Sequence, residues 1–520
     1  MSEPTKTLRS HLSGNWYEAG RDFQPLVNPA TEEPMARASS TGADFAGALA
    51  WARERGGPAL RTLTFAQRGE ILRGLGKKLR EQREELLALS LLNNGTTESD
   101  GAFDLDGAGG SLAFYGGLGI SFGPERLLAD SESVALGKGD GFWSAHALVP
   151  RHGAAIHINA FNFPAWGFAE KFACSFLAGV PTICKPATAT ALVTERIFEI
   201  LLASGLLPEG ALQLIVGSTG DLLDRLTAED TVAFTGSAAT ALALRSRPSV
   251  LASGARFNVE ADSLNAAVLA PDAHPGSATF ERFVKDVARE ITQKAGQKCT
   301  AVRRIIVPRE SEEAVTEALV ARLAKVVTGD PADPRVTMGP LANGAQLRDA
   351  LDGIAELLAT SQLVHGSGTR AQGVGAPQGK GFFLEPTLLR SEHPLEKTPV
   401  HWREVFGPVS TLLAYSGAAG DAAALVALGG GMLVSSVYTD DAGFAGDFLA
   451  RAGSSQGRVY FGSADSEGYG SGAALPQSLH GGPGRAGGGE ELGGRNGLRL
   501  YQQRVALQGT RAMVTKLVGE

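Results

Sequence analysis

Three side chains with the chemistry of acyl transfer are spread along the middle of the chain: Asn162, Glu260 and Cys299. A cysteine thiolate can attack a carbonyl carbon, a carboxylate can activate water, and an amide can donate a hydrogen bond to an oxyanion. Each residue also has an ordinary interpretation: a small buried thiol, a solvated acidic turn, and a cap for the helix that follows Asn162. Local sequence leaves both interpretations open for each.

Cys299 follows a helical pattern and stands among basic residues. Apolar residues recur at three- and four-residue spacing over 280–291, which predicts one buried helix face, and Gly296 is expected to end that helix. Cys299 is therefore predicted to lie in a turn, with Lys298 before it and Arg303–Arg304 after it. Positive charge near a thiol favours the reactive thiolate.

The composition excludes several classes of function. The chain has 520 residues, enough for about three domains, and its net charge of −7 is scattered without a basic stripe. We therefore expect small-molecule partners, with no nucleic acid and no membrane surface. Three cysteines without a disulfide framework or metal-ligand spacing predict a reducing compartment, the cytoplasm by default, and no metal site. Residues 1–6 lack the apolar core of a signal peptide, and no apolar stretch is long enough to cross a bilayer.

Alternating strand and helix patterns predict the architecture. Strands are expected at 154–158, 180–185, 212–216 and 232–234, with helices at 166–177 and from about 190 to 200. This alternation predicts a parallel sheet with helices on both faces, which binds its ligands at the carboxyl ends of the strands. The unusual polar motifs fall at these ends. A second α/β unit is predicted from 266 to about 476, with strands at 304–307 and 435–438 and a helix over 312–327.

Segments outside these units have their own patterns. A helix is expected at 45–53, a long amphipathic helix over 65–87, and a hairpin from strands at 134–136 and 142–149. A strand-like piece at 504–507 is expected to pair either with that hairpin or with another subunit. The glycine-rich run Gly481–Gly489 is either a shaped loop or a mobile segment.

Two short motifs have the form of phosphate-binding turns. Gly217 to Gly220 follows a strand and is expected to open a helix, and Phe234 to Ser237 places hydroxyls and free amides at a helix start. Neither contains the full dinucleotide fingerprint with three spaced glycines. A tight strand-to-helix turn without a ligand is the alternative for both.

The order of seven motifs resembles the aldehyde dehydrogenase superfamily over nearly the whole chain. The motifs are Phe161–Pro164, Lys185–Ala187, Phe234–Ser237, Glu260, Gly296–Cys299, Glu385–Thr387 and Glu404–Pro408. Within it, 259–265 and 479–489 resemble the branch that oxidises coenzyme A-linked semialdehydes in aerobic aromatic degradation. The chain ends soon after the dehydrogenase region, and we expect from this a role in benzoate rather than phenylacetate breakdown.

The resemblance implies an α/β fold with a Rossmann-type cofactor domain, an α/β catalytic domain and a small β oligomerisation element. The expected boundaries are 1–262 for the cofactor domain, from which a hairpin at 131–149 projects, and 263–480 for the catalytic domain. Residues 481–520 are expected to form a C-terminal loop and an oligomerisation strand. A homodimer is expected.

The resemblance also implies roles for individual residues. Cys299 would attack the aldehyde, and the Asn162 side chain and the Cys299 amide would hold the oxyanion of the thiohemiacetal. Hydride would pass to a nicotinamide, and Glu260 would activate the water that releases the acid. The residues expected to bind the cofactor are Lys185, Thr188, Gly217, Gly220, Thr235, Gly236, Ser237, Glu404 and Phe406.

Departures from the family pattern bear on specificity. Many members have a glutamate where this chain has Thr188, and a carboxylate there would repel a 2′-phosphate. A hydroxyl beside Lys185 can accommodate that phosphate, so NADP is expected over NAD. Glu170 and Phe161 are candidate substrate contacts. Glu170 either contacts substrate or pairs with Lys171.

Two other functions remain as alternatives. In a coenzyme A-acylating dehydrogenase, free coenzyme A would take the acyl group, but such an enzyme needs no deacylating base and Glu260 argues against it. A catalytically silent nucleotide-binding scaffold is disfavoured by the presence of Asn162, Glu260 and Cys299 together.

Overall fold

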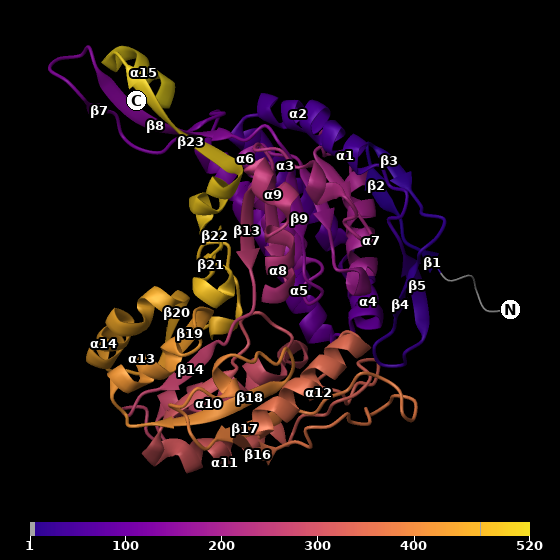
Figure 1. Ribbon diagram of the computed structural model, residues 1–520, viewed down its shortest axis with the longest axis vertical. Coiled ribbons are helices and arrows are strands. Elements are labelled where there is room, and N and C mark those ends of the chain that lie inside the picture. Colours follow the sequence, from indigo (N-terminus) through magenta and orange to yellow (C-terminus); the bar gives the residue numbers. More distant parts are fainter. Residues whose placement is uncertain (1–5, 469, 520) are drawn as a thin grey trace.

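Two seven-stranded sheets form the body of the molecule (Figure 1). This computed structural model describes residues 6–468 and 470–519. The segment before residue 6, where we expected no signal peptide, lies outside the described residues. None of the described helices combines the length and the apolar character that a membrane crossing needs.

The first sheet has the predicted parallel core. Its order is β13 (Arg256–Glu260), β12 (Thr231–Thr235), β9 (Ala155–Ile158), β10 (Thr182–Lys185), β11 (Leu212–Leu214), β2 (Ser10–Leu12) and β3 (Asn15–Tyr17). The strands from β9 to β13 are parallel, and β2 joins antiparallel to β11. Strands β9 and β11 are buried along their whole length, as expected when helices cover both faces of a parallel sheet.

The first sheet is accompanied by the predicted helices near 45–53, 166–177 and 200, and by others, over 98–122 for example, that were not predicted. Together they are α1 (Phe45–Trp51), α2 (Gly57–Thr62), α3 (Phe65–Glu81), α4 (Arg83–Asn94), α5 (Glu98–Phe122), α6 (Trp166–Ala178), α7 (Ala191–Ala203), α8 (Ala238–Arg245) and α9 (Pro248–Ser253). The single helix predicted over 65–87 is wrong, because Gln82 leaves helical geometry at φ −113° and divides it into α3 and α4.

The second sheet lies below the first in Figure 1. Its order is β16 (Ser361–His365), β17 (Thr387–Ser391), β18 (Val409–Tyr415), β15 (Arg304–Pro308), β14 (Ala266–Leu269), β19 (Met432–Tyr438) and β20 (Gln456–Gly462). Every pair except β16 with β17 is parallel. Its helices are α10 (Ala278–Thr292), α11 (Glu312–Leu323), α12 (Gly344–Leu358), α13 (Ala419–Ala427) and α14 (Ala442–Ala452). The second α/β unit is therefore confirmed.

An arm projects from the body at the upper left of Figure 1. It contains β6 (Leu128–Ala129), β7 (Val134–Ala135), β8 (Trp143–Pro150), β23 (Gln502–Gly509) and α15 (Arg511–Val518). Strand β7 pairs with β8, and β23 pairs with β8 over its whole length. The predicted hairpin is confirmed, and the tail strand pairs with it within the same chain.

Two small sheets complete the fold. One contains β1 (Lys6–Thr7), β5 (Pro34–Ala38) and β4 (Gln24–Val27). The other is the hairpin of β21 (Leu479–Gly481) and β22 (Glu490–Leu492), which lies between the two large sheets in Figure 1. The glycine run joins these two strands, so it is a shaped loop.

Candidate active site

A left-handed turn places Cys299 between α10 and β15. Helix α10 ends at Thr292, four residues earlier than predicted, and Lys294, Ala295 and Gly296 then have φ values of 54°, 52° and 66°. Each left-handed residue other than glycine costs about 1–2 kcal/mol. A Cβ on Gly296 would lie 2.2 Å from the Gly407 carbonyl oxygen, so only glycine fits at the end of this turn.

Hydrogen bonds from distant residues hold the cysteine loop. Asn265 Nδ2 donates to the carbonyl oxygens of Cys299 (2.7 Å) and Ala301 (3.0 Å). Thr300 Oγ1 donates to the carbonyl oxygen of Gly472 at 2.9 Å. Asn265 and Gly472, from two other parts of the chain, therefore hold the loop and give Cys299 a defined position.

The basic residues near Cys299 in sequence are engaged elsewhere. Lys298 Nζ lies 2.8 Å from Glu290 Oε2, and Arg303 Nε lies 3.5 Å from Glu404 Oε1. Arg304 donates to the Leu264 carbonyl oxygen. Burial and the neighbouring Glu260 carboxylate raise the pKa of the Cys299 thiol to about 11. Packing gives each of these basic residues another partner. Arg303 still attracts a Cys299 thiolate, so the expectation holds in part through this residue.

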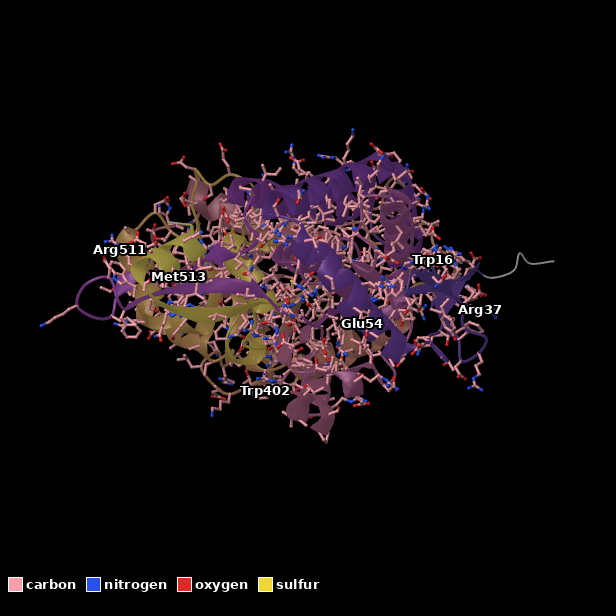
Figure 2. All side chains as sticks on the ribbon, turned by 90° about the horizontal axis from the view of Figure 1, so that it is seen from above. Trp16, Arg37, Glu54, Trp402, Arg511 and Met513 are labelled. Atoms are coloured by element: carbon pink, nitrogen blue, oxygen red, sulfur yellow. The ribbon has the colours of Figure 1, made fainter. Side chains whose placement is uncertain are left out.

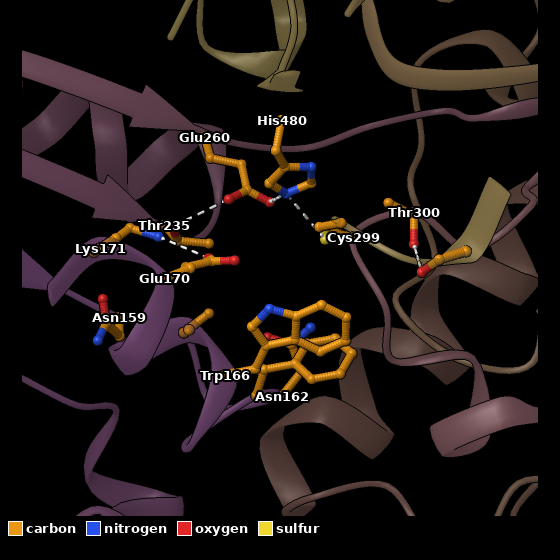
Figure 3. Close-up of a pocket in the computed structure, with 15 residues that line it drawn as sticks. Asn159, Asn162, Trp166, Glu170, Lys171, Thr235, Glu260, Cys299, Thr300 and His480 are labelled. Atoms are coloured by element: carbon orange, nitrogen blue, oxygen red, sulfur yellow. Dashed lines mark hydrogen bonds and ion pairs between the residues drawn. The ribbon is translucent and has the colours of Figure 1, made fainter. Parts of the chain in front are cut away.

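Glu260, at the end of β13, lies beside Cys299 with His480 between them (Figure 3). His480 Nε2 is 3.0 Å from Glu260 Oε1 and 3.7 Å from Cys299 Sγ. Thr235 Oγ1 donates to Glu260 Oε2 at 3.3 Å. Burial disfavours the Glu260 carboxylate, but the charge and the hydrogen bond of His480 outweigh it and lower the pKa of Glu260 to about 2. Glu260 ends a strand and is buried, with 2% of its surface exposed, so the solvated-turn interpretation is wrong.

Asn162 lies in the same pocket rather than at a helix cap. The amides of Ala165 and Trp166, at the start of α6, donate to the Asp104 carboxylate at 3.3 and 2.8 Å. Asp104 therefore caps this helix, and the capping interpretation of Asn162 is wrong. Asn162 lines the pocket that contains Cys299.

Two cavities meet at these residues. The smaller, of about 40 Å³, is lined among others by Trp166, Glu170 and His480. The larger, of about 630 Å³, extends toward Ser237 and Glu404. Both cavities are lined by Ala160, Asn162, Thr235, Glu260 and Cys299. Ligands in the two cavities would therefore meet at the cysteine.

Charged residues of α6 form part of the smaller pocket. Lys171 Nζ lies 3.3 Å from Glu170 Oε1 and 2.9 Å from Glu491 Oε2. Burial raises the pKa of Glu170 to about 7, although Lys171 opposes this. The predicted pairing of Glu170 with Lys171 is confirmed. Glu170 also lines the pocket, and its contact with the substrate stays a prediction.

Sequence comparison connects this geometry with known proteins. The profile of the aldehyde dehydrogenase family matches residues 16–506. The chain belongs to this family. It is 42% identical to 3,4-dehydroadipyl-CoA semialdehyde dehydrogenase of Aromatoleum evansii over 478 residues, which are 92% of this chain and 93% of that protein. The predicted family is thus confirmed, and the chain is an oxidoreductase that acts on aldehydes.

Solved structures of the family share the fold. Betaine aldehyde dehydrogenase from Staphylococcus aureus, in complex with NAD⁺, aligns with a TM-score of 0.84 at 24% identity over 97% of this chain and 95% of that one. A G224D mutant of aldehyde dehydrogenase from Bacillus cereus aligns with a TM-score of 0.82 at 21% identity over 97% of both chains. The predicted fold class is confirmed, and the Staphylococcus aureus protein holds NAD⁺ in this fold.

The larger cavity fits such a cofactor. Its volume is in the range of small-molecule sites, about 300–1,000 Å³. Glu404 Oε2 accepts from the Ser263 amide (3.1 Å). Its Oε1 lies 3.5 Å from Arg303 Nε but has no hydrogen-bond partner among the described residues, as suits an acceptor for a sugar hydroxyl. Ser237 caps α8, whose N-terminus favours an anionic group. One amide there is already used, because Ala238 N donates to Asp262 Oδ1 at 2.9 Å.

The other predicted cofactor residues divide into two sets. Thr235, Gly236, Ser237, Glu404 and Phe406 line the larger cavity. Among the described residues, its lining does not include Lys185, Thr188, Gly217 or Gly220, which follow or end β10 and β11.

The Gly217–Gly220 turn is explained by packing alone. A Cβ on Gly217 would lie 2.6 Å from the Ser40 amide nitrogen, and one on Gly220 would lie 2.6 Å from the Phe45 ring. A 3₁₀ turn (Leu222–Arg225) follows, so the predicted helix start is wrong at this point. The phosphate-binding role of both glycines stays a prediction.

Phe161 lies on the side of the larger cavity. Its ring packs edge to face against Phe406, with centroids 5.7 Å apart. It lines the larger cavity and not the 40 Å³ pocket. A contact of Phe161 with the substrate stays a prediction.

Sequence reasoning missed His480, Trp166 and Glu491 as site residues. His480 belongs to the motif at 479–489, which marked the family branch without suggesting a role. The available signal was a lone histidine directly before a glycine run. Such a run predicts close backbone approach to another element, and here that element is β13, which ends in Glu260.

Proposed function

We propose that this aldehyde dehydrogenase oxidises a coenzyme A-linked semialdehyde, 3,4-dehydroadipyl-CoA semialdehyde, to the free acid in aerobic benzoate degradation, with NADP as the oxidant. The observation that carries the proposal is the meeting of the two cavities at Cys299 and Glu260. The 42% identity with the enzyme of that name in Aromatoleum evansii supports the substrate.

The residues of the site account for the two halves of the reaction. Cys299 Sγ attacks the aldehyde carbon, and the resulting oxyanion accepts hydrogen bonds from the Asn162 side chain and the Cys299 amide. A nicotinamide in the larger cavity accepts the hydride when bound. Glu260 then takes a proton from water, which adds to the thioester and releases the acid. This use of Glu260 favours hydrolysis over transfer to free coenzyme A.

The dimensions of the pocket restrict which part of the substrate enters it. A space of about 40 Å³ lined by Trp166 and Phe163 admits only the aldehyde end of a chain. The coenzyme A part lies outside this pocket. Recognition of the acyl chain therefore depends on the mouth of the pocket rather than on a nucleotide-sized chamber beside Cys299.

The preference for NADP rests on the absence of a carboxylate at residue 188. Thr188 opens the 3₁₀ turn after β10, and Lys185 ends that strand. A hydroxyl and an ammonium group can donate hydrogen bonds to a 2′-phosphate, which a glutamate would repel. Thr188→Glu should therefore shift the ratio of kcat/KM values from NADP toward NAD.

The projecting arm suits a homodimer contact. Large apolar side chains are exposed on it, among them Val134, Phe142 and Met513, the last of which Figure 2 shows on the arm. Clusters of this kind mark protein interfaces. Sedimentation of the full chain and of Met513→Lys tests this contact. The three free cysteines suit a reducing compartment, so we place the reaction in the cytoplasm.

Steady-state turnover tests the function as a whole. The enzyme is assayed with 3,4-dehydroadipyl-CoA semialdehyde and with short free aldehydes, each with NADP and with NAD. We expect the highest kcat/KM for the coenzyme A-linked semialdehyde with NADP, and the free acid as product. Equal constants for free aldehydes would contradict the substrate, and a thioester product formed only with free coenzyme A would favour the acylating alternative.

A further inference from the structure

His480 is the polar side chain that links the two catalytic groups of the chain. One atom each from Glu260, Cys299 and His480 lies within 4.8 Å of the other two. The same ring nitrogen, Nε2, contacts both partners, at 3.0 Å from the carboxylate and 3.7 Å from the sulfur. The imidazole is buried, with 4% of its surface exposed.

The backbone around His480 is built to hold it in this place. The Gly489 amide donates to the Val259 carbonyl oxygen (3.1 Å), and the Ala261 amide donates to that of Ala486 (2.9 Å). A Cβ on Gly487 or Gly489 would lie 2.4 Å from the Val259 carbonyl oxygen. The glycine run is therefore clamped onto the residues that flank Glu260, and this contact sets the ring of His480 against the carboxylate.

The negative charge of Glu260 opposes formation of the Cys299 thiolate that the reaction needs. Two anions this close in a buried cavity repel each other, so a Glu260 carboxylate opposes a Cys299 thiolate. Nearby cations also have other partners. Lys298 pairs with Glu290, Arg303 with Glu404 and the peptide backbone, and Lys171 with Glu170 and Glu491. Arg458 donates to the carbonyl oxygens of Ser471 and Ala473. His480 is placed between the two groups whose repulsion has to be balanced.

We propose that His480 is a positioning residue that carries a positive charge between Glu260 and Cys299, holds the carboxylate in place and makes the thiolate attainable. The thiol proton leaves to water, and the Nε2–H group then faces two anions instead of one. This role rests on the proposed function only in that a thiolate is the nucleophile.

The electrostatics of the pocket agree with this role. Burial lowers the pKa of His480, but the Glu260 charge and the contact with Cys299 outweigh it, so the pKa lies well above its ordinary value. His480 in turn opposes the rise in the pKa of the thiol. The titratable groups that face this cluster are Glu260 on β13, Cys299 in its loop, Glu170 and Lys171 on α6, and Glu491 on β22. Arg303, which follows Cys299 in the chain, and Arg458 on β20 also interact electrostatically with Cys299.

Alkylation of the free enzyme tests the proposal without substrate or cofactor. The rate of Cys299 carbamidomethylation by iodoacetamide is measured from pH 5 to 11 in the wild type and in His480→Gln, which keeps hydrogen bonding but removes the charge. Peptide mass spectrometry assigns the label to Cys299. We expect the rate at pH 7 to be at least about tenfold lower in the variant, which corresponds to a rise of at least one pH unit in the midpoint. A smaller rise, or a fall, would overturn the proposal.

Two further variants make the outcome specific. His401→Gln removes a buried histidine that bonds to Arg304 and the Pro394 carbonyl oxygen, and it should leave the midpoint unchanged. Glu260→Gln should lower the midpoint by at least one unit because the competing anion is gone, and this measurement decides the matter if His480→Gln does not fold. A midpoint that Glu260→Gln leaves unchanged or raises would also overturn the proposal. Loss of aldehyde turnover with a normal alkylation profile would instead count against the proposed function.

Discussion

The two large sheets contribute to the site from opposite ends of their strands. In the first sheet, functional residues follow or end the strands: Asn162 after β9, Thr235 at the end of β12 and Glu260 at the end of β13. In the second sheet they precede the strands, with Cys299 before β15 and Glu404 before β18. The carboxyl edge of one sheet thus faces the amino edge of the other across the two cavities.

This difference limits what a general rule about α/β sheets can predict. Ligands bind at the carboxyl ends of parallel strands, and the rule applies to the first sheet, where it led to Asn162 and Thr235. For the second sheet, the same rule would have predicted the site at the carboxyl ends of the strands, which is the wrong edge. There, the left-handed turn at 294–296 and the hydrogen bonds from Asn265 hold the nucleophile at the opposite edge.

The largest expected effect comes from removing the nucleophile that the second sheet supplies. Cys299→Ala should lower kcat by at least about 10⁴-fold, because no other group forms the covalent bond. NADPH absorbance in the steady state measures this loss. Cys184→Ala, a buried cysteine of the first sheet, is the matched control and should keep activity within a few-fold. Substantial turnover by Cys299→Ala would place the chemistry elsewhere.

Removing the oxyanion donor of the first sheet should have the next largest effect. Asn162→Ala should lower kcat by about 10²–10³-fold, the usual cost of losing one oxyanion donor, with a smaller change in KM. Asn159 lines the same pocket, so Asn159→Ala serves as the control. Equal losses in the two variants would argue for a packing role of both residues rather than a hydrogen bond to the oxyanion.

The left-handed turn at 294–296, before Cys299, should also affect the free energy of unfolding. Gly296→Ala combines a positive φ with a backbone clash and should lower the free energy of unfolding by about 2 kcal/mol or more. Gly276→Ala has a φ of +88° but open space around its Cβ, so it should cost about 1 kcal/mol. Urea unfolding compares the two variants. Equal costs would mean that the loop relaxes away from Gly407.

The smallest effect concerns the cofactor side and depends on pH. Burial raises the pKa of Glu404 to about 7, so the group is neutral below pH 7 and becomes an acceptor for two hydroxyls above it. The KM for NADP should therefore fall as pH rises from 6 to 8. In Glu404→Gln it should be about fivefold higher at pH 8 and flat across this range. A variant that keeps the wild-type slope would assign the titration to another group.

Much of the fold was predictable because its strands are continuous apolar runs and its helices have regular apolar spacing. The strands from β9 to β12 and the helix before Cys299 follow from these local patterns. The break at Gln82 and the early end of α10 did not follow, because each depends on a turn conformation that packing stabilises. The site was predictable where a motif carried its own chemistry, as at Cys299 and Glu260.

The sequence by itself determined the reacting groups and their family, because a thiol, a carboxylate and an amide in one motif order define the chemistry wherever they lie. Only the tertiary structure decided how these groups are charged. His480 is 220 positions from Glu260 in the chain, and it reaches the carboxylate because the glycine run packs on β13. Lys298, next to Cys299 in sequence, forms an ion pair with Glu290 instead. Electrostatic interactions depend on distance in space and on burial, and neither can be read from position along the chain.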